Sequence, residues 1–162
     1  MDAELAALSE RIGKALRERS LTLATAESCT GGWVAEVVTH TGGSSGWFDR
    51  GFVTYSNEAK IDMLGVSPAT LLAHGAVSLE TANEMAAGAL ANSKALISLS
   101  ITGIAGPTGG SPDKPVGTVC FAWCRRDGIP LAKGCRFEGN REEIRRQSVI
   151  HALEGVLYLL AR

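Results

Sequence analysis

Apolar and polar positions change period along this 162-residue chain, and each change predicts the start or end of an element. Residues 1–20 place Leu5, Leu8, Ile12 and Leu16 on one face of an amphipathic helix. Three segments alternate as strands: residues 21–26 (LTLATA), 51–56 (GFVTYS) and 96–102 (LISLSIT). Helical spacing follows the first two strands, in residues 31–40 and 57–65, and precedes the third in residues 79–95.

Cap and turn residues divide the rest of the chain. Asn57 is expected to cap the helix 57–65, Ser67 and Pro68 to open a further short helix, and Ser78 to cap the helix 79–95. Residues 118–139 read as a hairpin turned at Asp127–Gly128. The last helix follows Asn140, with Glu143 completing a capping box. Its expected buried stripe is Ile150, Leu153, Leu157 and Leu160. This order predicts one layered α/β domain over residues 1–162, with a mixed sheet.

Composition narrows the class of protein. Apolar residues make up 45% and charged residues 20%, as expected for one compact globular domain. The net charge is −1 and no basic run exceeds two residues, which argues against nucleic-acid binding. No uncharged apolar segment approaches the roughly 18 residues that span a membrane. The four cysteines form no C-x-x-C pair, and Cys120 and Cys124 alternate with apolar residues as packed thiols, so a cytoplasmic protein is expected.

Candidate chemistry lies in three loops of small polar residues, at 28–32, 42–45 and 102–110. Ligands of open α/β sheets bind at the carboxyl ends of the strands. The first loop also leads into a helix, whose first N–H groups favour an anion. The chain lacks the glycine pattern of a P-loop or a dinucleotide fold.

Ser28 is the candidate nucleophile, and it needs a base. His40, His74 and His151 fall at positions more typical of structural or solvated histidines, and no metal-binding pattern is present. A partly buried lysine is the alternative base, which points to Lys60 with Tyr55 nearby. Cys29 has no visible cation to activate it, and the S-x-x-K match at 111–114 sits in a Gly/Pro loop. Arg141 and Arg145 share one helix face and can clamp a phosphate or carboxylate, or simply pair with nearby glutamates.

The motifs together are similar to one known family. AESCTGGWVAEVV, GGSSGWFDRGFVTYSNEAK, GIAGPTGG, KPVGTV and REEIRRQ occur in order, and from about Leu5 to Leu160 the chain closely resembles the CinA C-terminal-domain family. The resemblance implies a three-layer α/β/α sandwich. It also implies hydrolysis of nicotinamide mononucleotide to nicotinic acid mononucleotide and ammonia, in pyridine nucleotide salvage, with no cofactor and no metal. Larger family members carry an additional N-terminal domain, whose activity does not carry over.

The resemblance assigns roles by position. Ser28 would be the nucleophile, Lys60 the general base and Tyr55 an assisting hydroxyl, while Arg141 or Arg145 would bind the nucleotide's charge. The loops would hold the phosphate or oxyanion through Thr30, Gly31, Gly32, Gly43, Ser44, Ser45, Thr102, Gly103 and Gly106. Thr102 stands where the family pattern leads us to expect serine, and it keeps the hydroxyl.

Several alternatives stay open at this stage. Ser45 is a second candidate nucleophile, and water attacking directly, with Ser28 only orienting the amide, is a second mechanism. A nucleotide sensor without hydrolysis, a competence-related protein and an amidase for another substrate are rival functions. The sequence also leaves open whether copies of the chain form a homo-oligomer.

Overall fold

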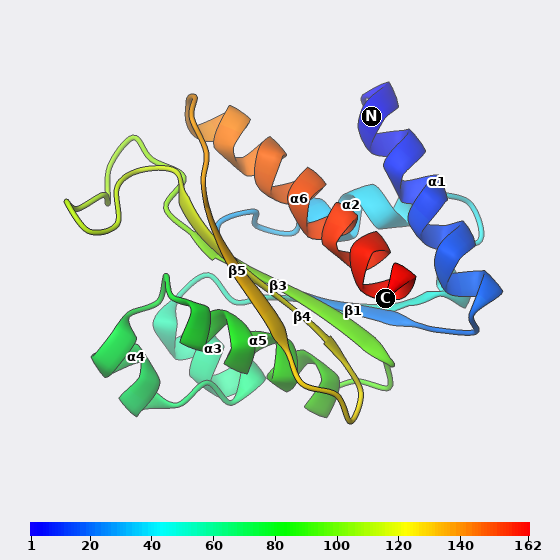
Figure 1. Cartoon of the computed structure of the whole chain (residues 1–162), viewed down its shortest axis with the longest axis horizontal. Coiled ribbons are helices and arrows are strands. Elements are labelled where there is room, and N and C mark those ends of the chain that lie inside the picture. The colour runs from blue at the N-terminus through cyan, green and yellow to red at the C-terminus, as the bar shows by residue number, and fades with distance from the viewer.

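Six helices, one short 3-10 turn and five strands make up the fold in the computed structural model, which describes all 162 residues (Figure 1). The helices are α1 (Ala3–Glu18), α2 (Trp33–Thr39), α3 (Asn57–Leu64), α4 (Pro68–His74), α5 (Leu79–Ala91) and α6 (Arg141–Ala161). The strands are β1 (Leu23–Glu27), β2 (Phe48–Val53), β3 (Ile97–Gly103), β4 (Thr118–Arg125) and β5 (Leu131–Arg136). The 3-10 turn η1 spans Ser44–Gly46. None of the helices combines the length and apolar composition needed to cross a membrane.

One mixed sheet separates two layers of helices. Its strand order is β2-β1-β3-β4-β5, with β1 parallel to both β2 and β3 and the β3–β4 and β4–β5 pairs antiparallel. Helices α1, α2 and α6 cover one face, and α3, α4 and α5 cover the other (Figure 1). The expected three-layer sandwich is therefore confirmed. Because β1, β2 and β3 run the same way, their carboxyl ends share one edge of the sheet.

Two apolar cores fill the spaces between the layers. The larger joins α1, α2 and α6 to the sheet and contains the predicted α1 face, in which Leu5, Leu8, Ile12 and Leu16 are all buried. The smaller lies under α5 and contains Cys120 and Cys124 as free, buried thiols. Both cores close around a sheet whose central strand β3 is buried along almost its whole length.

The second strand was placed three residues too late by the alternation pattern. The structure has β2 at 48–53 and not at 51–56, so Phe48 to Arg50 belong to the strand and not to a loop. The strand lies at an edge of the sheet and is largely exposed, so its apolar alternation is weak. Gly51 is required inside it, because a Cβ there would come within 2.7 Å of the Thr25 hydroxyl on the neighbouring strand.

Two predicted helix ends also differ. The cap of α3 is Ser56, whose hydroxyl accepts the Ala59 N–H at 3.0 Å, and Asn57 is instead the first helical residue. Helix α5 ends at Ala91 and not at residue 95, because the Asn92 side chain donates to the Gly88 carbonyl and closes the last turn. Both helix ends are set by polar side chains, which hydrophobic periodicity does not detect.

The final helix has the predicted capping box, but its buried stripe is shifted. Asn140 and Glu143 exchange the reciprocal hydrogen bonds as expected. Leu153 and Leu160 are buried, whereas Ile150 and Leu157 are only half-buried. Helix α6 packs against both α1 and the sheet. Its buried apolar residues are Ile144, Val149, Ala152, Leu153, Val156, Leu159 and Leu160. A helix packed against two partners buries a wider stripe than one apolar row predicts.

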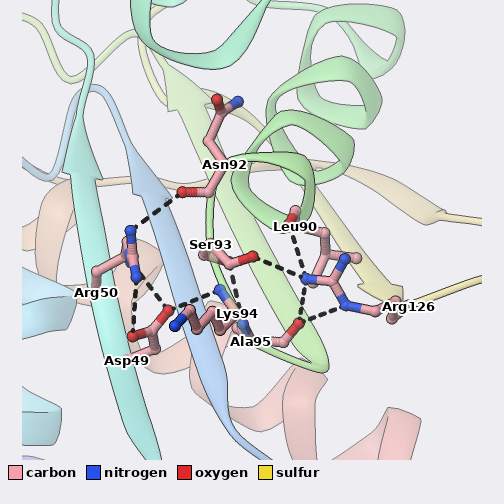
Figure 2. A network of polar contacts seen from close by, with 8 residues as sticks. All are labelled: Asp49, Arg50, Leu90, Asn92, Ser93, Lys94, Ala95 and Arg126. Atoms are coloured by element: carbon pink, nitrogen blue, oxygen red, sulfur yellow. Dashed lines mark hydrogen bonds and ion pairs between the residues drawn. The ribbon is translucent and has the colours of Figure 1, made fainter.

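A polar network joins the start of β2, the end of α5 and the β4–β5 hairpin, at the edge of the sheet where β2 and β3 begin (Figure 2). Arg126 donates to the carbonyl oxygens of Leu90 (2.8 Å), Ser93 (3.1 Å) and Ala95 (2.6 Å). Asp49 pairs with Arg50 and accepts the Lys94 N–H at 3.0 Å. The guanidinium of Arg126 thus binds carbonyl groups in the last turn of α5 and in the loop that follows it.

We expect Arg126→Ala to lower the free energy of unfolding by about 1–2 kcal/mol, since hydrogen bonds to a charged donor are lost at three carbonyls. Urea unfolding followed by circular dichroism measures the change. Arg125→Ala is the matched control, because this neighbouring arginine is exposed and makes no side-chain hydrogen bond. Equal stability of the two variants would contradict a stabilising role for the Arg126 contacts.

Candidate active site

A cleft of about 310 Å³ opens at the edge of the sheet where β1, β2 and β3 end. Seven of the residues predicted for the site line it: Ser28, Tyr55, Lys60, Thr102, Gly103, Gly106 and Arg141. They come from four segments that are far apart in the sequence. The parallel arrangement of the three strands therefore brings together the expected nucleophile, base and assisting hydroxyl.

The Lys60 ammonium nitrogen is the centre of the cleft's polar contacts. Its Nζ lies 3.0 Å from Ser28 Oγ, 2.9 Å from the Thr54 carbonyl oxygen and 3.2 Å from the Tyr55 carbonyl oxygen. Lys60 is 1% exposed and Ser28 is 7% exposed. Helix α3 positions this lysine, because its side chain extends back towards the helix N-terminus and the end of β2.

Burial lowers the pKa of the Lys60 ammonium, and no carboxylate pairs with it to oppose that effect. A neutral amine has two N–H donors and one lone pair. The two carbonyl oxygens can accept both N–H groups, which directs the lone pair at the third neighbour, the Ser28 hydroxyl. In that protonation state, the arrangement would let Lys60 accept a proton from the Ser28 hydroxyl.

The turn that carries Ser28 is held by a buried carboxylate. Glu27, 1% exposed, accepts the Thr30 hydroxyl at 2.7 Å and the N–H groups of Val34 at 2.9 Å and Ala35 at 3.1 Å. Thr30 is itself fully buried and points at Glu27. Thr30 therefore supports the turn from inside and does not line the cleft.

The start of α2 does not offer the free anion site that the sequence suggested. Two of its first N–H groups are bonded to the Glu27 carboxylate, so the chain itself supplies the negative charge that this helix end favours. Gly31 and Gly32, with φ values of 58° and 102°, form the left-handed turn before the helix and lie outside the cleft wall. Sequence could not reveal this, because Glu27 reads as an ordinary strand-end residue.

Free backbone donors lie instead in the loop after β3. The N–H groups of Ala105, Gly106, Thr108 and Gly109 donate to no other protein group, and all four residues line the cleft. These groups can stabilise a developing oxyanion or a phosphate.

The two candidate arginines of α6 have different positions. Arg141 lines the cleft, where it donates to the Gly106 carbonyl at 2.8 Å and to the Tyr55 hydroxyl at 3.3 Å. Arg145 lies behind the nucleophile's turn, donating to the carbonyl oxygens of Cys29 and Thr30 at 3.0 and 3.2 Å. Its guanidinium also sits 5.5 Å from the centre of the Trp33 ring. Arg141 can reach a ligand, whereas Arg145 braces the turn.

The second serine loop is not part of the cleft. Gly43, Ser44 and Ser45 precede β2, and Tyr55 follows it. A six-residue strand is about 20 Å long, so these residues lie at the end of β2 that is opposite to the cleft. The structure does not bring Ser45 to Lys60.

Thr102 lines the cleft but uses its hydroxyl to fix a neighbouring wall. Its Oγ1 donates to the Ala76 carbonyl at 2.7 Å. Ala76 and Val77, from the connection between α4 and α5, form that wall. Sequence analysis missed these two residues because they carry no reactive group. It also missed Asn57, which lines the cleft although its sequence position suggested a helix cap.

Cys29 is a poor nucleophile in this setting. Burial raises the pKa of its thiol to about 11, so the reactive thiolate is scarce near neutral pH. No group of three or more His, Cys, Asp or Glu side chains lies close enough together to hold a metal ion.

A second depression, of about 500 Å³, lies between β5 and α6. His151 borders it and contacts Cys135 at 3.5 Å within an aromatic cluster. Burial lowers the pKa of His151 and raises the pKa of Cys135, so burial favours the uncharged form of each side chain. The first cleft is therefore the candidate active site.

Comparison with known proteins gives an independent line of evidence. Residues 5–160 match the family model described as the CinA C-terminal domain. Nicotinamide-nucleotide amidohydrolase PncC of Escherichia coli strain K12 is 55% identical over 153 residues, which cover 94% of this chain and 93% of that protein. The Pseudomonas putida protein of the same name is 49% identical and covers 94% of both chains.

Other relatives have other names. A putative competence-damage inducible protein of Symbiobacterium thermophilum is 51% identical, but the chain spans only 38% of its length. Among solved structures, competence/damage inducible protein CihA of Agrobacterium tumefaciens has a TM-score of 0.95 and 47% identity, covering all of this chain and 98% of that one. A competence-damaged protein (CinA) superfamily protein of Klebsiella pneumoniae has a TM-score of 0.93 and 39% identity, covering 97% of this chain and 98% of that chain.

Proposed function

The chain belongs to the CinA C-terminal domain family, and from that premise we propose that it hydrolyses nicotinamide mononucleotide to nicotinic acid mononucleotide and ammonia. Its relatives of matching length carry the name nicotinamide-nucleotide amidohydrolase. The observation that carries the proposal is the buried Lys60 nitrogen 3.0 Å from Ser28 Oγ. Acyl transfer from an amide needs this pairing of nucleophile and base.

The proposed reaction has two halves. Neutral Lys60 removes the proton from Ser28 as its oxygen attacks the carboxamide carbon, and the free N–H groups beside the cleft stabilise the oxyanion. The C–N bond then breaks, and Lys60 returns its proton so that ammonia leaves. Water then attacks the ester as Lys60 takes its proton, and Lys60 returns that proton to Ser28 Oγ when the acyl–oxygen bond breaks, which releases the carboxylic acid and restores Ser28.

Tyr55 and Arg141 assist from the mouth of the cleft. The Tyr55 hydroxyl accepts a hydrogen bond from Arg141, which leaves its own proton free to donate a hydrogen bond to the substrate. Arg141 has further donors for the phosphate, and the loop containing Gly106 offers the free N–H groups already described. We assign the phosphate to this side of the cleft.

The reaction fits salvage of pyridine nucleotides, because it converts the amide form of a mononucleotide into the acid form. All four cysteines of the chain are free thiols. Free thiols persist in a reducing compartment, which supports the cytoplasm as the place of this reaction.

Purified protein is expected to release one ammonia for each nicotinamide mononucleotide consumed, with nicotinic acid mononucleotide as the product. A coupled ammonia assay and chromatography measure both. Nicotinamide, which lacks the ribose phosphate, is the matched control and should react far more slowly. Stoichiometric binding of the nucleotide without ammonia release would instead support a sensor.

A further inference from the structure

Asn57 is the polar residue of the cleft to which no role has been given. It is the first residue of α3 and is exposed, and it lines the cleft beside Ser28, Tyr55 and Lys60. The capping role belongs to Ser56. The Asn57 amide makes no hydrogen bond to another group of the chain, so both its donor and its acceptor are free.

The position of Asn57 relative to Lys60 indicates how deep in the cleft Asn57 would contact a ligand. Residues three apart on a helix share one face, so Asn57 and Lys60 face the cleft together. Lys60 and Ser28 are 1% and 7% exposed and lie deep, whereas Tyr55 is 63% exposed at the mouth. Since Asn57 is exposed as well, it contacts a part of the substrate further from the reacting carbonyl.

The chemistry of an amide side chain indicates which part of the substrate Asn57 contacts. An amide offers N–H donors and an oxygen acceptor together. A phosphate has only acceptor oxygens at neutral pH, and Arg141 with the free N–H groups of the loop suits it better. Neighbouring ribose hydroxyls each donate and accept, and they lie between the pyridine ring and the phosphate.

We infer that Asn57 recognises the ribose hydroxyls of the substrate, an inference that rests on the proposed function. Its two-sided hydrogen bonding selects a ribosyl group over a chain or sugar without vicinal hydroxyls. Asn57 acts in binding, and the bond-breaking steps stay with Ser28 and Lys60.

The test compares Asn57→Ala with the parent on three substrates: nicotinamide mononucleotide, its analogue without the 2′- and 3′-hydroxyls, and nicotinamide riboside. We expect KM for the mononucleotide to rise about three- to tenfold, as for the loss of a neutral hydrogen bond or two, with kcat within about twofold. The same penalty is expected on the riboside, and none on the dideoxy analogue. Glu58→Ala is the matched control, because Glu58 is the next residue of α3, exposed and outside the cleft wall.

Three outcomes would overturn the inference. An undiminished penalty on the dideoxy analogue would separate Asn57 from the hydroxyls, and a penalty that vanishes on the riboside would move it to the phosphate. A fall in kcat alone on every substrate would move it to the reacting amide. Calorimetric binding of the mononucleotide and its dideoxy analogue gives the same comparison without turnover, so failure of the proposed reaction remains distinguishable.

Discussion

Ser28→Ala is expected to lower kcat for nicotinamide mononucleotide by about a thousandfold or more, with KM changed less than about threefold. The hydroxyl is the atom that Lys60 contacts at 3.0 Å, and alanine removes the attacking oxygen while leaving the turn intact. Main-chain bonds hold that turn, from Ser28 N–H to the Ile101 carbonyl and from Gly31 N–H to the Ser28 carbonyl. Ammonia release under saturating substrate measures the change.

Ser45→Ala is the matched control for the nucleophile and is expected to keep full activity. Ser45 lies beyond the opposite end of β2, outside the cleft wall. Loss of activity in this variant with retention in Ser28→Ala would contradict the assignment of Ser28. Rapid acid quenching followed by mass spectrometry should detect the ester of nicotinic acid mononucleotide on Ser28; its absence during fast turnover would favour direct attack by water.

Lys60→Met is expected to abolish turnover to a similar degree and at the same time to change how the stability of the fold depends on pH. Methionine retains the apolar stem but has no lone pair for the Ser28 proton. Burial lowers the pKa of Lys60 in the folded chain, so the unfolded chain binds a proton more readily. Methionine does not titrate, so this pH-dependent contribution is absent from the variant, whereas the loss of the N–H donors to the Thr54 and Tyr55 carbonyls costs about 1–2 kcal/mol at every pH.

The lowered pKa of Lys60 determines how the stability of the parent changes with pH. Above the ordinary pKa of a lysine both states are neutral, and the parent pays no penalty. As the pH falls towards the lowered pKa of the folded state, the unfolded state gains protons first and the parent loses stability. The stability of Lys60→Met relative to the parent should therefore rise as the pH falls through this window and become constant below it. Catalysis by the parent should decline as the folded-state Lys60 becomes protonated.

Lys14→Met is the matched control for Lys60, because the Lys14 side chain is 75% exposed and outside the cleft. It should change neither turnover nor the pH dependence of unfolding. Urea titrations at several pH values and rate profiles over the same range measure both effects. A difference in stability between Lys60→Met and the parent that does not change with pH would contradict a lowered pKa of Lys60.

Local patterns were enough to predict most of the fold. Apolar periodicity and cap residues together identified all the helices, and Asp127, with φ of 65°, turns the hairpin where the sequence placed it. Errors occurred where two local signals compete, as at Ser56 and Asn57, or where exposure weakens the alternation, as in β2. An exposed edge strand has no single buried face to impose a period of two.

The sequence by itself determined the residue types of the site, the loops that carry them and the family to which they belong. Ser28, Tyr55 and Lys60 could be named because their chemistry and motifs are local. Only the tertiary structure decided which of them meet: it joined Lys60 to Ser28 and put Ser45 at the far end of β2. It also showed that the Thr30 hydroxyl bonds the Glu27 carboxylate and that Asn57 lines the cleft. The physical reason is that strand direction and order set distances between remote segments, and burial sets the pKa of Lys60, and neither is encoded within one short stretch of chain.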